Sequence, residues 1–400
     1  MSLLILIIVY MLAISGFLLA LFLALEVAAA IFSRAEKFRP TEDVAGSIKV
    51  IVPAHNEAAN IASTLDNICA QLRGADSVLV VADNCTDNTA LLARDAGADV
   101  IERNDLERRG KGYALQFALD HLRASPPEIV IFTDADCLFA PGALKRIASV
   151  AAHEGRPAQA LYLMKAPKGA NARLKAAEFA WAFMNNVRMR GLQQLFDVTR
   201  FTGAGLAAPW QLLENVQMGS GEIVEDLSLT MQLIRKDAAP LLVADAIIES
   251  EFPVEEAALT RQSARWSIGS LRYGARASVR ALIEGVKRER AQQIGAAIDL
   301  MVPPLTIFVG ALMAVALASA LCWLLFGASG AFGLAFSALL LTSGSIAGAW
   351  FKFGREILPV SEMRGLASFL ISKLSVFGAK GRESAKRWTP TRSDSEKDGL

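Results

Sequence analysis

The stretch Ile48-Lys49-Val50-Ile51-Val52-Pro53-Ala54-His55-Asn56-Glu57 decides the fold of this chain. It is an apolar, β-branched run that ends at a proline and leads into polar residues, which is typical of a buried strand opening into a loop. Two similar runs follow, Val78–Val81 and Ile129–Phe132, and the stretches Glu57–Leu72 and Gly112–Leu122 have helical periodicity. Apolar strands that alternate with helices predict an α/β fold with a mostly parallel sheet, covered on both faces.

Acidic side chains come directly after the predicted strands. The second strand leads to Asp83, and the third leads to Asp134-Ala135-Asp136. Ligands of open α/β sheets bind beyond the carboxyl ends of the strands, so these groups are candidates for one site. The two carboxylates of Asp134 and Asp136 repel each other unless a cation is near, and Mg²⁺ or Mn²⁺ suits such oxygen ligands and bridges to substrate phosphates. Each aspartate by itself could equally be a turn former or a helix cap.

The composition points to a protein that is associated with a membrane. Of the 400 residues, 53% are hydrophobic and 20% are charged, and the formal net charge is +1. This is too apolar for an ordinary soluble protein, and the net charge gives no reason to expect nucleic acid as a partner. Basic residues gather between Arg261 and Arg290, which favours contact with a membrane surface. No disulfide framework or zinc site is predicted, because no Cys-x-x-Cys pair occurs among Cys69, Cys85, Cys137 and Cys322.

Two apolar regions are long enough to cross a membrane. The first runs from about Leu3 to Phe32, and the second, from about Val302 to Phe353, is interrupted at Gly327–Gly330. A bilayer is spanned by about 20 apolar residues, so we expect one N-terminal transmembrane helix and a C-terminal transmembrane hairpin. Basic flanks beside both regions favour the cytoplasm, which places the N-terminus outside and the central region inside.

The expected domain organisation follows from these regions. Residues 1–33 would form the N-terminal transmembrane helix, 46–290 a cytosolic α/β domain with interfacial helices, and 300–353 the transmembrane hairpin. An amphipathic interfacial segment is expected over 354–379, and a disordered tail, rich in charged residues and serine, over 380–400.

Three further motifs could contribute to a site. Glu225-Asp226 stands where a helix is expected to begin, Phe201-Thr202-Gly203-Ala204-Gly205 is a loop of small residues, and Gln262-Ser263-Ala264-Arg265-Trp266 has helical spacing. In a helix, Gln262, Arg265 and Trp266 share one face, where a guanidinium could bind phosphate and an indole could stack on a sugar. The alternatives are a helix N-terminal cap, a tight turn, and an interfacial helix with a buried tryptophan.

The order of these motifs, together with Arg109-Gly110-Lys111-Gly112, resembles the membrane-bound members of glycosyltransferase family 2, which include the cellulose, chitin and hyaluronan synthases and many bacterial exopolysaccharide glycosyltransferases. The resemblance covers roughly Val50 to Gly269. Each motif is weak alone, whereas the ordered set is specific. Two departures are visible: Ala82-Asp83 replaces the usual paired aspartates, and the pentad keeps only its defining Gln, Arg and Trp.

The resemblance implies a GT-A fold and an inverting, metal-dependent sugar transfer. Pro53, His55, Glu57 and Asp83 would bind the nucleoside of the donor, and Lys111 matches a basic position on the donor side. Asp134 would contact the donor nucleotide and, with Asp136, the Mg²⁺ or Mn²⁺ on its diphosphate. Asp226 would be the general base. The acceptor and diphosphate site would be lined by Gly203, Glu225, Gln262, Arg265 and Trp266.

The activity that follows from the resemblance moves a sugar from a nucleotide-sugar, with a UDP-sugar expected, to a polyprenyl-diphosphate-linked or other lipid acceptor. Such a transfer belongs to cell-surface or exopolysaccharide biosynthesis, in a multi-pass protein of the cytoplasmic membrane whose active site faces the cytoplasm. The amphipathic stretch Leu174–Leu195 could meet a lipid diphosphate or be an ordinary packed helix.

Several alternatives stay open from the sequence. A processive polysaccharide synthase is one, although three spans are few for a self-sufficient pore, and a glycolipid glucosyltransferase acting on ceramide or hopanoid is another. A non-catalytic membrane scaffold is disfavoured by the intact Asp134, Asp136, Asp226 and Arg265. A glycoside hydrolase, which needs two carboxylates and water, is disfavoured because the strand-end acids suit a nucleotide.

Overall fold

The computed structural model describes residues 2–33, 38, 44–219, 224–253, 255–363 and 365. The tail predicted over 380–400, and residues 364 and 366–379 of the interfacial segment predicted over 354–379, lie outside these residues. The described residues form two compact units, one from the ranges 1–33, 171–196 and 270–373, and one from the ranges 34–170 and 197–269. Residues 171–196 and 270–290, which lie inside the predicted domain 46–290, thus group with the long apolar helices.

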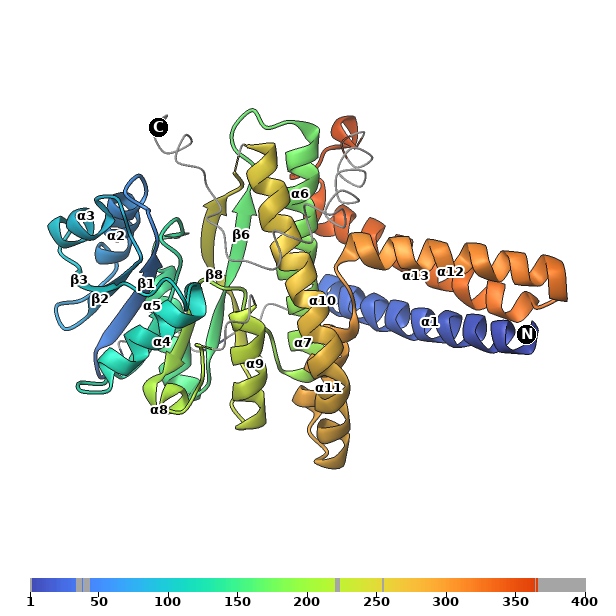
Figure 1. Cartoon of the computed structure of the whole chain (residues 1–400), viewed down its shortest axis with the longest axis horizontal. Coiled ribbons are helices and arrows are strands. Elements are labelled where there is room, and N and C mark those ends of the chain that lie inside the picture. The colour runs from blue at the N-terminus through green and yellow to red at the C-terminus, as the bar shows by residue number, and fades with distance from the viewer. Residues whose placement is uncertain are drawn as a thin grey trace. The chain divides into compact units, whose positions relative to one another are not determined.

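The second unit contains one eight-stranded sheet, with the order β3-β2-β1-β4-β7-β6-β8-β5 (Figure 1). Its parallel half consists of β1 (Ile48–Ala54), β2 (Ser77–Asp83), β3 (Asp99–Arg103) and β4 (Ile129–Phe132). The three strands predicted from the sequence are confirmed as β1, β2 and β4. The strand β1 continues through Pro53, which is tolerated because its pairing with β4 ends at Ile51 and only β2 lies beside it there.

The other half of the sheet is mixed. Strand β7 (Leu206–Pro209) runs antiparallel to both β4 and β6 (Ala158–Lys165), and β8 (Leu241–Glu251) is parallel to β6. The short β5 (Leu138–Phe139) closes the edge antiparallel to β8. The mostly parallel sheet expected from the sequence is therefore present.

Helices cover the sheet as the chain order requires. The connections β1–α2–β2–α3–β3 step outward along the sheet and place α2 (Ile61–Cys69) and α3 (Thr89–Asp95) on one face, whereas α4 (Lys111–Leu122) returns over the opposite face. The helices α5 (Ala143–Glu154), α8 (Trp210–Leu213) and α9 (Glu225–Arg235) complete this layer structure. Buried side chains of β1, β2, β4, α4 and α9 form one continuous core, which includes Ile51, Leu79, Phe132, Leu115 and Leu229.

The first unit is built around α1 (Ser2–Phe32), α12 (Leu305–Phe326) and α13 (Ser329–Ala349), which packs on α1 and α12 and continues as η2 (Trp350–Gly354). Among the described residues, three helices are long and apolar enough to cross a membrane, and their positions agree with the predicted N-terminal helix and C-terminal hairpin. The hairpin turns at Gly327, whose φ of 73° suits glycine. A short turn of helix, η3 (Val360–Glu362), follows.

The amphipathic stretch 174–195 forms three consecutive segments in the first unit, α6 (Ala172–Ala182), η1 (Phe183–Arg188) and α7 (Met189–Phe196). Its side chains pack against α1 and against α11 (Ala291–Met301), which agrees with the packed-helix alternative. The Arg188 guanidinium is 1% exposed, lies 2.9 Å from a Glu26 carboxylate oxygen of α1, and pairs with Asp299 of α11.

One helix, α10 (Glu256–Lys287), belongs to both units. Its residues 256–269 are grouped with the sheet, and its residues 270–287 are grouped with the long apolar helices. The Gln262–Trp266 pentad is helical, as its spacing predicted, and lies in the first part.

Candidate active site

The loops that follow β1 and β2 are bound to each other. The Thr86 amide donates to the Asn56 side-chain oxygen at 2.7 Å, and the Glu57 amide donates to the Thr89 hydroxyl at 2.7 Å. Asn56 and Asn84 have positive φ values of 52° and 54°, which asparagine tolerates better than most residues. The loops at the carboxyl ends of β1 and β2 are therefore held together by hydrogen bonds. They form one ordered edge of the sheet, which we call the rim.

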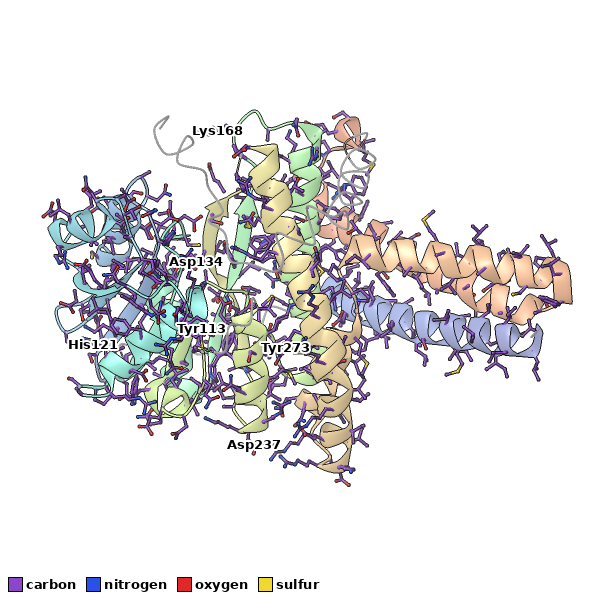
Figure 2. All side chains as sticks on the ribbon, viewed as in Figure 1. Tyr113, His121, Asp134, Lys168, Asp237 and Tyr273 are labelled. Atoms are coloured by element: carbon purple, nitrogen blue, oxygen red, sulfur yellow. The ribbon has the colours of Figure 1, made fainter. Side chains whose placement is uncertain are left out.

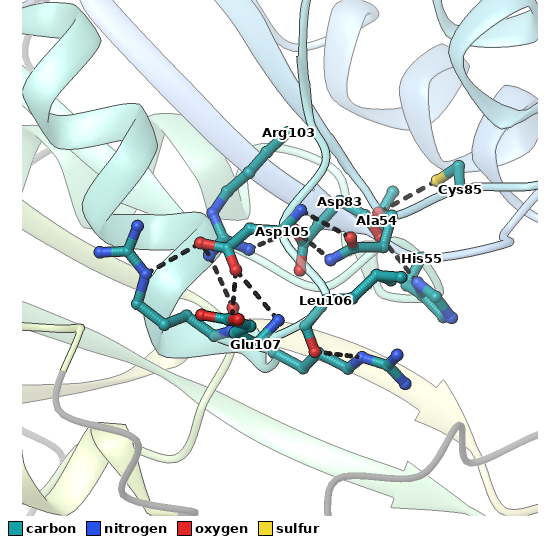
Figure 3. Close-up of polar contacts among 11 residues, drawn as sticks. Ala54, His55, Asp83, Cys85, Arg103, Asp105, Leu106 and Glu107 are labelled. Atoms are coloured by element: carbon teal, nitrogen blue, oxygen red, sulfur yellow. Dashed lines mark hydrogen bonds and ion pairs between the residues drawn. The ribbon is translucent and has the colours of Figure 1, made fainter.

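Asp83 is held at this rim by a buried guanidinium (Figure 3). The Arg103 NH1 group donates to Asp83 Oδ1 at 2.6 Å, and its NH2 group lies 3.2 Å from Asp105 and 2.6 Å from the Arg108 carbonyl. His55 Nδ1 lies 2.7 Å from the Asp83 carbonyl oxygen. Burial raises the pKa of Asp83 above its usual value, and the hydrogen bond from Arg103 opposes this shift. The orientation of Asp83 is thus fixed before any ligand binds.

The loop after β4 brings two carboxylates together. The carboxylate oxygens of Asp134 and Asp136 and the Cys137 sulfur all lie within 4.8 Å of one another. The loop is supported from α2, where the Thr64 hydroxyl donates to the Ala135 carbonyl at 2.7 Å. Cys137 is buried, and Mg²⁺ and Mn²⁺ prefer oxygen ligands to sulfur, so the two carboxylates are the better ligands of the three. The two partly exposed carboxylates fit a hard cation such as Mg²⁺ or Mn²⁺.

Lys111 connects this loop to the start of α9. Its ammonium is hydrogen-bonded to Asp134, donates to the Gly203 carbonyl at 2.8 Å and lies 4.0 Å from Glu225 Oε1. Burial lowers the pKa of Lys111, but the Asp134 and Glu225 carboxylates more than offset this, so the pKa rises and the ammonium stays charged. Figure 2 labels Asp134 in the sheet-bearing unit, where this contact lies.

Glycines permit the close approach of these elements. A Cβ atom added to Gly112 would lie 2.4 Å from the Met218 carbonyl and 3.5 Å from Glu225 Cβ, so no larger residue fits where α4 passes this segment. Gly203 has a φ of 88°, and a Cβ atom there would lie 3.6 Å from Lys111 Nζ. The small-residue loop expected from the sequence therefore forms one wall beside the Lys111 ammonium.

Glu225 and Asp226 open α9, as predicted. The Glu225 side chain is 12% exposed, and burial raises its pKa to about 7, against the influence of Lys111. Burial also raises the pKa of Asp226, while the Leu227 amide, which donates to Asp226 Oδ1 at 2.8 Å, and the charges of Lys111 and Arg200 oppose the shift. Both carboxylates thus sit within the electrostatic reach of the same ammonium that binds Asp134.

The pentad on α10 faces the same charges. Burial lowers the pKa of Arg265, whereas the Glu225 and Asp134 carboxylates stabilise its charge. The Gln262 Oε1 atom and the Thr202 hydroxyl are buried and have no hydrogen-bond partner among the residues that the structure describes. Buried polar atoms without a protein partner are uncommon, and they suit a polar ligand. Trp266 lies one helical turn after Gln262, half-buried.

Most of the predicted site residues fall into two groups, one around the loop after β4 and one at the ends of β1 and β2. Asp134, Asp136, Lys111, Gly203, Glu225, Asp226 and Arg265 are linked through direct contacts or through their charges. Asp83 and His55 form the second group, with Pro53 in the adjoining strand. The Glu57 carboxylate accepts a hydrogen bond from the Asn60 side chain at 2.9 Å, at the start of α2.

Two residues near the site were not predicted from the sequence. Arg103, the partner of Asp83, is the last residue of β3, a strand that was not among those predicted from the sequence. Arg200, which acts on the pKa of Asp226, precedes the small-residue loop. The sequence offered one signal for Arg103: it is a charged residue at the end of a short run that mixes apolar and charged residues. His121 (Figure 2) and His153 are exposed, as expected.

Comparison with known proteins gives partial sequence relatives. The chain is 33% identical over 99 residues to a low-salt glycan biosynthesis hexosyltransferase of Haloferax volcanii, covering 24% of this chain and 22% of that protein. It is 36% identical over 98 residues to the glucosyl-3-phosphoglycerate synthase of Mycobacterium tuberculosis, covering 23% of this chain and 29% of the relative. These alignments span less than a third of either relative's length.

A solved structure and a family model cover far more of the chain. A mannosyltransferase from Pyrobaculum calidifontis, solved in complex with GDP-Man and Mn²⁺, aligns with 93% of this chain and 98% of its own, with a TM-score of 0.54 and 20% sequence identity. This likeness shows the GT-A-like fold. The model of the glycosyltransferase-like family 2 matches residues 45–269, which include the whole sheet and both groups of site residues. The chain therefore belongs to glycosyltransferase family 2.

Proposed function

We propose that this protein transfers a sugar from a nucleotide-sugar to an acceptor hydroxyl, with inversion at the anomeric carbon and with Mg²⁺ or Mn²⁺ as cofactor. The observation that carries the proposal is the position of Lys111, which binds Asp134 on one side and lies 4.0 Å from Glu225 on the other. The Lys111 ammonium thereby connects Asp134, which is suited to a metal-bound diphosphate, with the Glu225–Asp226 pair, which is suited to proton transfer. A scaffold without activity does not need this costly burial of charge.

The donor would bind along the strand ends. Asp134 and Asp136 would hold the divalent cation, which supplies positive charge for the departing diphosphate. Asp83, fixed by Arg103, would accept a hydrogen bond from the base, and Arg265 would bind diphosphate oxygens. The expected donor is a UDP-sugar, while the Pyrobaculum structure carries GDP-Man, so both bases need testing.

The transfer itself needs one base. The acceptor oxygen forms a bond to the anomeric carbon from the face opposite the nucleotide, and the bond from that carbon to the diphosphate oxygen breaks, so the nucleoside diphosphate leaves with the electron pair. The acceptor proton passes to Asp226 as the oxygen attacks. Lys111 favours the charged forms of Glu225 and Asp226, because its ammonium lowers their pKa values against the larger, opposite effect of burial.

The acceptor is proposed to be lipid-linked and presented at the cytoplasmic face of the membrane. The three helices long enough to span a bilayer support a membrane location, with the sheet-bearing unit on the basic-flanked side. The name of the Haloferax relative, a glycan biosynthesis hexosyltransferase, agrees with a glycan role of the kind found in cell-surface or exopolysaccharide assembly.

The test is a transfer assay on the full chain in membranes. UDP- and GDP-sugars are supplied with Mn²⁺ or Mg²⁺, together with polyprenyl-diphosphate-linked glycan, glycolipid precursor or no added acceptor. Addition of one sugar to the lipid-linked glycan supports the proposal. A long polymer made without added acceptor would indicate a processive synthase instead, and a product found only with the glycolipid precursor would indicate a glycolipid glucosyltransferase.

A further inference from the structure

The second part of α10, residues 270–287, has an exposed face of unusual composition. All of this segment is described, and its exposed positions follow helical spacing: Arg272, Ala275, Arg276, Val279, Arg280, Ile283, Val286 and Lys287. We call these eight residues the α10 outer face. Val279, Ile283 and Val286 are 55%, 49% and 59% exposed. The face thus combines three β-branched apolar side chains with four basic ones and has no acidic member.

The acidic residue nearest to this face does not cancel its charge. Glu284 is half-buried at its border and receives a hydrogen bond of 2.8 Å from Arg280 Nε. Residues 270–287 hold four basic residues and one acidic residue, Glu284. A helix with apolar and basic residues on one exposed face is typical of segments that lie on an anionic membrane surface.

The opposite face of this segment packs against α11. This packing prevents the helix from rotating to bury its exposed apolar residues. Gly274 approaches so closely that a Cβ atom would lie 2.6 Å from the Leu300 carbonyl. The Gln293 side chain donates to the Ala281 carbonyl at 3.0 Å, and a Cβ atom on Gly285 would lie 3.1 Å from Ile294 Cγ1. This small-residue contact holds the outer face away from α11.

The chain places this helical pair next to the spans. α11 ends at Met301 and α12 begins at Leu305, and the three residues between them reach about 10 Å at most. Asp299 of α11 pairs with Arg188, which also binds Glu26 of α1. In Figure 1, α11 and the later part of α10, beyond Tyr273 in Figure 2, run across the direction of α1, α12 and α13. If the long helices span a bilayer, this crossing direction beside the start of α12 orients α11 and the later part of α10 along the membrane surface.

We propose that the α10 outer face binds the anionic phosphate headgroups of the membrane, with Val279, Ile283 and Val286 inserted at the acyl boundary. The proposal rests on the proposed membrane location of the long helices. Its consequence is functional, because the same continuous helix carries Gln262, Arg265 and Trp266, which lie 13 to 17 residues before Val279. Binding of anionic lipid would hold α10 in place and so position these three side chains for catalysis.

The first experiment measures insertion and does not require activity. The full chain with Cys69→Ser, which removes the exposed cysteine, receives Ile283→Cys and an environment-sensitive fluorophore, in nanodiscs of phosphatidylcholine with or without phosphatidylglycerol. We expect a blue shift and quenching by brominated lipid, both stronger with phosphatidylglycerol. Leu91→Cys, at a residue 55% exposed on α3, is the matched control and should show neither.

The results separate the possible occupants of this face. A label at residue 283 that stays in water in both nanodiscs overturns the proposal. A blue shift without quenching by brominated lipid shows that protein, such as a second copy, covers the face, and this also overturns it. Failure of the chain to insert into nanodiscs would contradict the proposed membrane location, whereas insertion with a solvated label contradicts only the lipid contact.

The second experiment measures the effect on turnover. We expect phosphatidylglycerol to raise the transfer rate of the parent about threefold or more, because the anionic lipid surface attracts the basic side chains of the α10 outer face. The triple variant Arg272→Gln, Arg280→Gln, Lys287→Gln should match the parent in pure phosphatidylcholine and lose the increase. The control variant Arg94→Gln, Arg123→Gln, Lys145→Gln, at exposed basic positions of the other unit, should keep it. Equal stimulation of the parent and the first triple variant would overturn the functional part.

Discussion

The ammonium of Lys111 is hydrogen-bonded to Asp134, 23 residues away in the sequence, and this contact joins the start of α4 to the acidic loop after β4. The same ammonium lies 4.0 Å from Glu225 at the start of α9. In the proposed reaction Asp134 contacts the metal-bound diphosphate and Asp226 accepts a proton, so one ammonium connects the two acidic groups.

Replacing Lys111 by glutamine should lower transfer by about 100-fold or more, because the variant loses the positive charge that stabilises the ionised form of the neighbouring carboxylates. Lys111 lowers the pKa of Glu225, so the pKa of Glu225 should rise further in this variant. The pH–rate profile should shift toward higher pH. Lys145→Gln, at an exposed position on α5, is the control, and an unchanged profile in Lys111→Gln would argue against this role.

Asp226→Asn should lower the transfer rate by about 100-fold to 10,000-fold, while nucleotide binding stays nearly unchanged. The amide keeps the size of the side chain but cannot accept the acceptor proton. Turnover and calorimetric binding of the nucleoside diphosphate, measured on the same preparation, check both parts. Asp95→Asn, at an exposed position, should behave as the parent, and near-normal turnover in Asp226→Asn would remove it from the role of base.

Glu225 should make the free protein less stable as the pH rises. Its folded-state pKa of about 7 lies above its ordinary value of 4.5, so the folded state binds the proton more tightly than the unfolded state does. The favourable contribution is complete below pH 4.5 and is lost as the pH rises through 7. Glu225→Gln should therefore raise the melting temperature at pH 8 relative to the parent, with little gain at pH 5, and should lower transfer. A constant difference across this pH range would contradict the assignment, and Glu214→Gln serves as an exposed control.

Asp136→Ala should weaken the metal-dependent binding of the donor, because only one of the two clustered carboxylates remains. A titration of nucleoside diphosphate with and without Mn²⁺ measures the effect. Binding in the absence of metal should be similar in variant and parent, whereas the enhancement by Mn²⁺ should be lost. The same enhancement in both proteins would place the metal elsewhere.

Arg188→Met should destabilise the first unit by about 3–5 kcal/mol, because it leaves the buried carboxylates of Glu26 and Asp299 without their cation. The destabilisation is measured by heating the protein in detergent and recording the temperature at which monodisperse protein is lost. Adding Glu26→Gln and Asp299→Asn to Arg188→Met should restore much of the stability. No recovery in the triple variant would show that packing of the Arg188 side chain matters more than its charge.

The sequence predicted the parts of the fold that depend on long apolar patterns. β1, β2 and β4 are continuous buried runs, and the three long helices are apolar along their whole length, so local composition is enough to identify them. β3 was missed because Asp99-Val100-Ile101-Glu102-Arg103 pairs along one side only and keeps charged residues. Its last residue, Arg103, was missed for the same reason.

The site was predicted in its residue types but not in its contacts. Asp134, Asp136, Glu225 and Asp226 stand in recognisable motifs, whereas the contact of Lys111 with Gly203, which lies 92 residues away, depends on how β7 adds to the sheet. The grouping of residues 171–196 with the long helices also depends on tertiary packing. Gly191, for example, approaches the Glu26 carbonyl so closely that a Cβ atom would lie 2.0 Å from it. Such relationships arise from packing and leave little trace in local sequence.

The most direct test of the proposed activity is the release of nucleoside diphosphate by the purified full chain, supplied with nucleotide-sugar and lipid-linked acceptor, with Mn²⁺ and then with a chelator. We predict turnover that requires the metal and that is lost in both Asp136→Ala and Asp226→Asn, with an inverted anomeric configuration in the product. Equal release with Mn²⁺ and with chelator, or equal release by the parent and both variants, would contradict the claim that these acids form one catalytic centre.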